Sequence, residues 1–247
     1  MATFVLVHGA WLGGWCWKRI RKGLHGAGHD VFTPTLTGLG ERSHILTRDI
    51  DLETHILDVV NLIQWQELSN IVLCGHSYGG AVISGVADRI PDRIGSLVYL
   101  DAFVLHNGEN VAQHMPAVRW KEFIDCANSV GDGWKIPPIP PEVFNVKSAS
   151  DADWMRRQCT MQPIGCFQER IKLTGKIDEI KNVTFVLMTG YGQRSPFPPF
   201  QERAKAKGWR TLTMTCGHMA MFDQPEELSR ILLQHSEAQH TEFGVTA

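Results

Sequence analysis

Long apolar runs and clusters of basic residues are missing from this chain, and each absence removes a class of protein. No apolar stretch approaches the ~18 to 20 residues that a membrane-spanning helix needs. No run of Lys or Arg offers a surface for nucleic acid or an anionic membrane, and the formal net charge is −2. We therefore expect neither nucleic acid nor a membrane as a partner.

Cysteine pairs with CxxC spacing are also missing, which argues against a disulfide framework or a zinc site. The six cysteines are instead expected to be reduced and mostly buried: Cys16, Cys74, Cys126, Cys159, Cys166 and Cys216. We expect no metal and no other cofactor. The chain begins without the basic segment and apolar core of a signal peptide, so a cytoplasmic location is predicted. The sequence does not decide between a monomer and a homodimer.

The chain does contain an alternation of short apolar runs and helical patterns. Strands are predicted at residues 4–7, 31–32, 71–74, 97–100, 183–188 and 212–214. Helices are predicted at residues 17–27, within 51–65, and at 81–89, 200–207 and 226–233. Such alternation is typical of an α/β fold with a parallel sheet and helices on both faces. The 43% hydrophobic content is ample for the core of one large domain.

The middle of the chain breaks this alternation. Residues 105–176 contain no clear strand, and "KIPPIPPEVF" brings four prolines that disfavour helices and central strands. A structureless loop of this length is implausible in a compact domain. We therefore predict a small, mostly helical cap at residues 105–176, inserted into a core formed by residues 1–104 and 177–247. Its Trp, Met and Pro residues favour an apolar acyl or aromatic ligand.

One motif carries the predicted chemistry. Gly75-x-Ser77-x-Gly79 follows an apolar strand and precedes a helix, as in the nucleophile elbow of serine hydrolases. The small residues let the turn close, and the helix points its positive end at the serine. The backbone N–H of Tyr78 would face an oxyanion formed there. The loop after the first strand offers the N–H of Ala10 as a second donor.

Two histidine-containing loops complete the pattern. His218 follows the last predicted strand, and the order serine then histidine is that of α/β-hydrolases. We expect its neutral form to act as the base, with a pKa near or somewhat above neutrality. His8 is predicted to shape the oxyanion loop through a hydrogen bond. His76 is predicted to pack or hydrogen-bond next to the nucleophile.

Three segments resemble one branch of the α/β-hydrolase superfamily. "HGAWLGGWCW", "GHSYGG" and "GHMAMFDQPEEL" are similar to the plant methylesterases and hydroxynitrile lyases. The whole chain, including "TPTLTGLGERSH", "VYLDAFV" and "SPFPPFQERAKAKGW", is more similar still to bacterial esterases of that branch. The resemblance implies a six-stranded, mostly parallel core with a small cap and no cofactor. It also implies that Ser77 attacks an ester, that His218 is the base, and that Ala10 and Tyr78 form the oxyanion hole.

Three departures from the lyases favour an esterase. The lyases have a lysine directly after the catalytic histidine, where this chain has Met219. They have a threonine at the position of Gly9 and a glutamate at that of His76. A carbon–carbon lyase thus remains a weaker alternative, and a non-catalytic protein that binds a ligand in the capped pocket is another. The predicted function is a serine esterase that forms an acyl-enzyme with a small apolar or aromatic ester. The residues predicted to contact the substrate are Trp11, Phe103, Trp134, Phe197 and Met219.

The third member of the triad is the open question. The plant relatives carry an aspartate just after the penultimate strand, but "LMTGYGQRSPFPPF" has no acid, and Gln193 occupies the aligned position. Asp101 ends the strand that follows the nucleophile helix, so it is predicted at the catalytic edge of the sheet and is our candidate. Asp223 is a weaker candidate and is predicted to cap the last helix. The remaining alternative is that the acid was lost or replaced.

Overall fold

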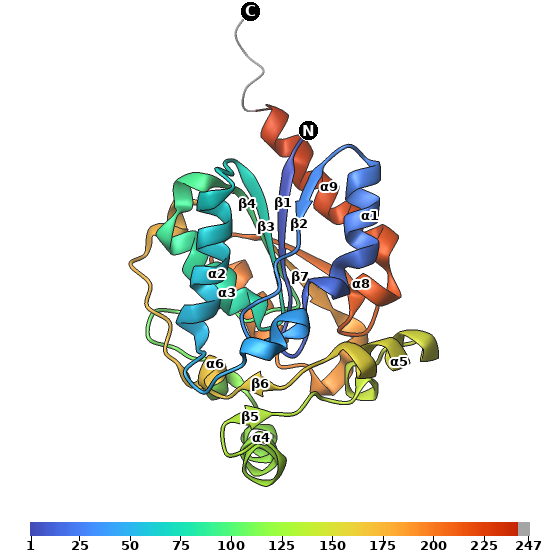
Figure 1. Cartoon of the computed structure of the whole chain (residues 1–247). Helices are drawn as coiled ribbons and strands as arrows, with labels where there is room; N and C mark the ends of the chain where they lie inside the picture. The colour runs from blue at the N-terminus through green and yellow to red at the C-terminus, as the bar shows by residue number, and fades with distance from the viewer. Residues whose placement is uncertain (242–247) are drawn as a thin grey trace, which may run out of the picture.

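A six-stranded sheet forms the centre of the molecule (Figure 1). The computed structural model describes residues 1–241, except for the side chains of residues 193, 194 and 237–241. The strand order is β2-β1-β3-β4-β7-β8, and all the strand pairs in this sheet are parallel. The strands are β1 (Thr3–Val7), β2 (Asp30–Phe32), β3 (Ile71–His76), β4 (Ile94–Leu100), β7 (Val183–Met188) and β8 (Arg210–Met214). The predicted α/β-hydrolase sheet is confirmed.

Helices cover both faces of this sheet, as the alternation predicted. The pair α1 and α9 lies on one face and the pair α2 and α3 on the other (Figure 1). Strands β3 and β7 are buried along their whole length, which explains their continuous apolar sequences. The helices that surround the sheet are α1 (Lys18–Gly26), α2 (Leu52–Trp65), α3 (Gly79–Arg89), α7 (Pro198–Ala206), α8 (Ala220–Asp223) and α9 (Pro225–Thr241).

The strand order reverses between β1 and β3. The chain passes from β1 to its neighbour β2 on one side and then returns to place β3 on the other side. In open parallel sheets, ligands bind at the carboxyl ends of the strands at such a switch point. The loops that leave β1 and β3 carry Ala10 and Ser77, so the topology brings the predicted site residues to the same edge.

The segment predicted as a cap lies beyond this edge (Figure 1). Between β4 and β7 the chain forms α4 (Ala117–Val130), α5 (Ala149–Gln158) and α6 (Gly165–Gln168), with short 3-10 turns at Ala112–His114, Pro141–Phe144 and Lys176–Glu179. A two-residue antiparallel ladder also joins β5 (Lys135–Ile136) to β6 (Gln162–Pro163), a pairing that the sequence did not predict. The division into core and cap stays a prediction.

Asp88, near the end of α3, anchors the chain where it returns from this segment. Its buried carboxylate accepts hydrogen bonds from the backbone N–H groups of Thr174 at 2.6 Å, Gly175 at 2.9 Å and Ile177 at 3.2 Å. These bonds fix the backbone that leads into β7.

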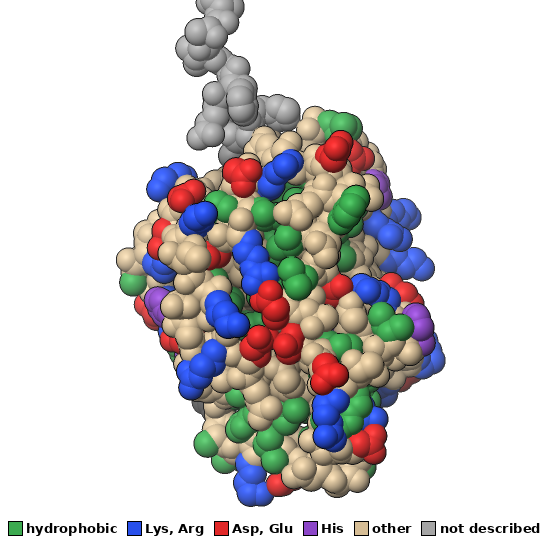
Figure 2. Space-filling view, turned by 60° about the vertical axis from the view of Figure 1, so that its left-hand side comes forward, with side chains coloured by type: hydrophobic (Ala, Val, Ile, Leu, Met, Phe, Trp, Pro, Cys, Tyr) green, Lys and Arg blue, Asp and Glu red, His purple; other side chains and the backbone are tan. Residues whose placement is uncertain are grey.

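The distribution of surface charges and the burial of the cysteines match what the composition predicted. Figure 2 shows Lys and Arg side chains interspersed with Asp and Glu on one face of the molecule. The six cysteines are unpaired, and all but Cys126 and Cys159 are buried, so the prediction of mostly buried thiols is confirmed. No helix among the described residues is long and apolar enough to cross a membrane.

Candidate active site

Ser77 occupies a strained turn between β3 and α3. Its φ is 56°, in the left-handed region that non-glycine residues rarely adopt. The flanking glycines are required by space: a Cβ on Gly75 would lie 2.5 Å from the carbonyl oxygen of Gly79, and one on Gly79 would lie 2.8 Å from that of Val7. Within the described structure, Ser77 Oγ makes no hydrogen bond and lines a cavity. The turn therefore presents a free hydroxyl to that cavity.

Asp101 and His218 contact each other through their side chains. Nδ1 of His218 lies 2.6 Å from Oδ2 of Asp101, and both side chains are buried. The other carboxylate oxygen, Oδ1, accepts a hydrogen bond from the backbone N–H of Met188 at 3.1 Å. Asp101 follows β4 directly and has a φ of 45°, so it also sits in a strained turn at the sheet edge. Nε2 of His218 has no hydrogen-bond partner among the described residues, Ser77 Oγ included.

Burial decides the ionisation of this pair. It lowers the pKa of His218 from 6.5 to about 3, because a charged ring loses its hydration there. This burial acts against our expectation of an apparent pKa near or somewhat above neutrality, which the pH profile of activity tests. Burial also raises the pKa of Asp101, against the hydrogen bond from Met188. The neutral imidazole that a general base needs is thus the favoured state.

Aromatic rings fix the orientation of His218. The ring of Phe197 is stacked on it at 5.1 Å between centroids with an interplanar angle of 9°, and that of Tyr191 is stacked at 4.9 Å. Phe144 and His76 approach to 5.2 and 4.4 Å. These contacts come from four separate elements or turns, so the imidazole is held by tertiary packing and shielded from water.

His76 and His8 support the site through backbone contacts. His76 Nε2 donates to the carbonyl oxygen of His218 at 3.0 Å, while its Nδ1 has no partner among the described residues. His8 Nδ1 donates to the carbonyl oxygen of Gly9 at 2.8 Å, and its Nε2 accepts from the backbone N–H of Leu36 at 3.0 Å. Burial lowers the pKa of His8 to about 4, so this ring is neutral at neutral pH. The local hydrogen bonds predicted for both histidines are confirmed.

The two predicted oxyanion donors face the same cavity. Ala10 and Tyr78 both line it. Neither backbone N–H donates a hydrogen bond to any described residue, so both are available to a ligand. The Tyr78 side chain is fully buried, and its hydroxyl pairs with His55 Nδ1 at 2.9 Å. Tyr78 therefore contributes its backbone to the site, while its side chain anchors the turn.

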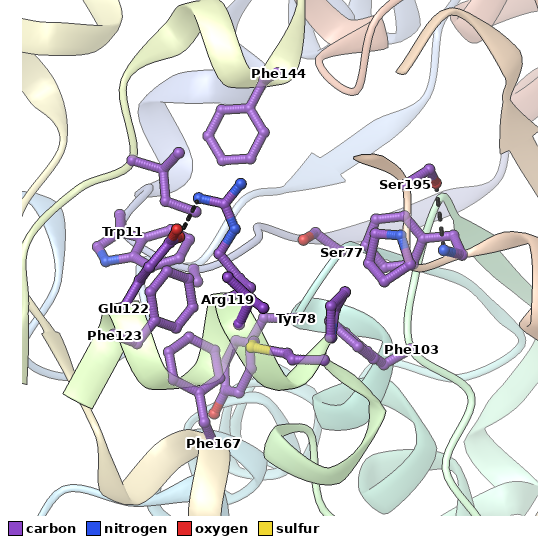
Figure 3. Close-up of a pocket in the computed structure, with 17 residues that line it drawn as sticks. Trp11, Ser77, Tyr78, Phe103, Arg119, Glu122, Phe123, Phe144, Phe167 and Ser195 are labelled. Carbon is purple, nitrogen blue, oxygen red and sulfur yellow. Dashed lines mark hydrogen bonds and ion pairs between the residues drawn. The ribbon is translucent and has the colours of Figure 1, made fainter. Parts of the chain in front are cut away.

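The cavity has a volume of about 280 Å³ and a mostly apolar wall that is rich in aromatic rings (Figure 3). Trp11, Phe103 and Phe197 line it, as predicted. Trp134 does not: it immediately precedes β5, where its carbonyl oxygen accepts from the backbone N–H of Ile164 at 2.8 Å. Met219 is also outside the wall, because it is buried at the start of α8. These two predicted contacts are therefore corrected.

The cap segment supplies wall residues that the sequence analysis missed. Phe123 and Arg119 come from α4, Glu122 lies beside them, and Phe167 comes from α6. The (i, i+3) and (i, i+4) spacing on α4 places the first three on one helix face, which is a detectable signal. The pattern could not reveal that this face meets the serine, because that depends on how the segment folds back.

The alternative acids occupy other places. Asp223 ends α8, and its carboxylate accepts from the backbone N–H groups of Gly217 and Lys147, each at 3.2 Å. It therefore supports the loop before His218 and does not cap α9, which begins at Pro225; the capping prediction is wrong. The side chain of Gln193 lies outside the described residues. Among the described residues, no group of three or more His, Cys, Asp or Glu side chains could hold a metal ion.

Comparisons with known proteins identify the family of this chain. Residues 4–231 match the model of the alpha/beta hydrolase family. The chain is 42% identical to the carbendazim hydrolyzing esterase of Nocardioides sp. (strain SG-4G), over 94% of this chain and 98% of that protein. It is 25% identical to salicylic acid-binding protein 2 of Nicotiana tabacum, covering 94% and 95%. An extracellular alpha/beta-hydrolase from a Paenibacillus species has a similar structure, with a TM-score of 0.83 and 26% identity, covering 95% and 99%. This chain therefore belongs to the alpha/beta hydrolase family.

Proposed function

We propose that this protein is a serine esterase that hydrolyses small carboxylic esters carrying an apolar or aromatic group. One observation carries the proposal: the free hydroxyl of Ser77 shares a cavity with the unpaired N–H groups of Ala10 and Tyr78. The contact between His218 and Asp101 adds a base and its orienting acid. The esterase names of the relatives support hydrolysis of an ester.

The proposed reaction has two halves. Ser77 Oγ attacks the ester carbonyl as its proton passes to Nε2 of His218, and the N–H groups of Ala10 and Tyr78 stabilise the oxyanion. His218 then gives the proton to the departing alcohol, which leaves an acyl group on Ser77. A water molecule, deprotonated by His218, releases the acid and restores the serine. Asp101 keeps the proton on Nδ1 and stabilises the imidazolium in both halves.

The cavity supports the proposed substrate size. A volume of about 280 Å³ lies at the small end of ligand pockets, so it fits one aromatic group with a short ester. The wall includes Trp11, Phe103, Phe123 and Phe167, which favour a flat apolar ring. Carbendazim, which the relative's name states as its substrate, is a methyl carbamate on an aromatic heterocycle and is a suitable test compound.

A burst assay tests the proposal. Rapid mixing of the protein with p-nitrophenyl butyrate should release about one equivalent of p-nitrophenol before steady turnover, and mass spectrometry should find a butyryl group on Ser77. In Ser77→Ala both signals should vanish while circular dichroism stays unchanged. Loss of a triad nucleophile costs on the order of 10⁶ in rate in a serine protease. Retention of more than a tenth of wild-type turnover would remove Ser77 from the role.

The two other candidate functions predict different results. A lyase would release cyanide from mandelonitrile, but its lysine position is Met219, which is buried outside the cavity. A non-catalytic binding protein would bind esters without a burst, and the short contact between His218 and Asp101 weighs against it. The cytoplasmic location and the homodimer also stay as untested proposals, which fractionation and analytical ultracentrifugation can test.

A further inference from the structure

The cavity wall carries one pair of opposite charges that the proposed reaction does not use. Arg119 and Glu122 both line the cavity, and Arg119 Nη1 lies 3.2 Å from Glu122 Oε2. In Figure 3 the guanidinium of Arg119 extends from α4 into the space between the rings of Trp11 and Phe144. Ser77 points into the same cavity from the opposite side of this view. A substrate held at Ser77 therefore has a charged pair facing its other end.

Both charged groups keep unused hydrogen-bonding capacity. A guanidinium has five N–H donors and a carboxylate has about four acceptor sites. The ion pair with Glu122 is the sole polar contact of Arg119 among the described residues, and the same holds for Glu122. The side chains are 35% and 55% exposed, so a ligand can reach them. The pair thus offers donors and acceptors side by side.

The remaining wall gives a substrate few polar partners. Ser195 Oγ accepts a bond from the backbone N–H of Phe197, and the Tyr78 hydroxyl is buried against His55. Apart from Ser77 and the two oxyanion donors, the polar side chains on the described wall are therefore the Ser195 hydroxyl, which keeps its O–H to donate, and the charged pair of Arg119 and Glu122. Discrimination between aromatic substrates of similar shape would depend on this pair, because a polar group left unpaired on binding costs more than a lost apolar contact.

We propose that Arg119 and Glu122 form a polar subsite for a neutral group that has a hydrogen-bond acceptor beside a donor, such as a primary carboxamide. The guanidinium donates to the carbonyl oxygen, and the Glu122 carboxylate accepts from the amide N–H. The proposal rests on the proposed esterase function and narrows its substrate to aromatic esters with such a group opposite the ester. An anionic substituent is disfavoured, because Glu122 already neutralises Arg119 and would repel it.

Binding to a protein without the nucleophile tests the subsite separately from turnover. Calorimetry on Ser77→Ala would compare methyl 4-carbamoylbenzoate with methyl 4-acetylbenzoate, which has nearly the same shape but no N–H donor, and with monomethyl terephthalate, which carries a carboxylate. We expect the carbamoyl ester to bind about tenfold more tightly than the acetyl ester and more tightly than the carboxylate, because hydrogen bonds to charged groups are the stronger ones.

Variants of the pair give the decisive comparison. In the Ser77→Ala background, Arg119→Met with Glu122→Met should bring the ratio of the two affinities close to one, while Glu122→Gln should raise affinity for the carboxylate. The matched control replaces both members of the ion pair Arg230 and Glu227 on α9 by Met, and it should keep the tenfold ratio. Four outcomes would each overturn the proposal. In Ser77→Ala these are equal affinities for the two neutral esters, tighter binding of the carboxylate, or no binding of either neutral ester. The fourth is a tenfold ratio that persists after the substitutions on α4.

Discussion

Oδ2 of Asp101 lies 2.6 Å from Nδ1 of His218, although the two residues follow strands β4 and β8, which β7 separates in the sheet. The two side chains meet because parallel strands bring their carboxyl ends to one edge. The relatives that the sequence resembles carry their acid after the penultimate strand, where this chain has no carboxylate. The acid of the proposed triad therefore comes from a neighbouring strand and reaches the same imidazole.

Asp101→Asn should cut ester turnover while the fold survives. An amide can donate to Nδ1 of His218 and select the tautomer that leaves Nε2 protonated. The same substitution of the triad aspartate in a serine protease lowers kcat by about 10⁴. Steady-state hydrolysis of p-nitrophenyl butyrate measures the loss. Asp223→Asn is the matched control and should retain far more activity, because its carboxylate contacts backbone N–H groups and not the imidazole. Near-wild-type turnover in Asp101→Asn would remove Asp101 from the triad.

The fall of kcat/KM on the acid side of the pH profile should have its midpoint below pH 6.5. A general base acts when neutral, and its neutral fraction rises as pH passes upward through its pKa. Since burial lowers the pKa of His218, activity should persist below the pH at which a free histidine is half protonated. The measurement is kcat/KM from pH 4 to 8 at the isosbestic wavelength of p-nitrophenol, with thermal melts showing where the fold holds. A midpoint at or above 6.5 would mean that the Asp101 charge outweighs burial.

Gly9→Ala should lower kcat more than it raises KM. The added Cβ would lie 2.9 Å from Ser77 Cβ and 3.0 Å from His76 Nδ1, so the nucleophile turn or the oxyanion loop must move. A displacement of about 1 Å near reacting groups can cost about 100-fold in rate. Gly26→Ala is the matched control, since a Cβ there meets nothing within 4 Å. If both variants behave like the wild type, close packing against Gly9 is not required for catalysis.

Asp88→Ala should destabilise the fold by about 1–3 kcal/mol, because the buried N–H of Ile177 loses its acceptor, while the N–H groups of the exposed Thr174 and Gly175 can bond to water instead. Urea denaturation measures the change. The exposed Asp92→Ala is the control and should stay within about 0.5 kcal/mol. An equal effect of the two substitutions would contradict the anchoring role.

The contribution of the Asp88 carboxylate to the free energy of unfolding should decrease at acid pH. Burial raises the pKa of Asp88, but the hydrogen bonds from Thr174, Ile177 and Gly175 together bring it below 3.8. A carboxyl with a lowered folded pKa stabilises the fold above its unfolded pKa, and this contribution is lost as pH falls through the folded value. The stability difference between wild type and Asp88→Ala should therefore shrink below about pH 3.8. A difference that grows on acidification would contradict this assignment.

Features set by local chemistry could be predicted from the sequence. The strands appear as short apolar runs because they are buried on both faces, and the turn around Ser77 requires glycines at positions 75 and 79 for steric reasons. His218 and Asp101 were identifiable because each follows a strand whose end must lie at the binding edge. These inferences need the order of elements along the chain and no detail of packing.

Features set by long-range packing emerged from the tertiary structure alone. Phe123, Arg119 and Phe167 reach the cavity because residues 105–176 fold back over the sheet edge, and helical spacing cannot say what a helix face will meet. Trp134 and Met219 have the right chemistry for a substrate wall, yet backbone direction and burial place them outside it. The downward shift of the His218 pKa likewise follows from the aromatic enclosure, because desolvation depends on neighbours that are distant in the sequence.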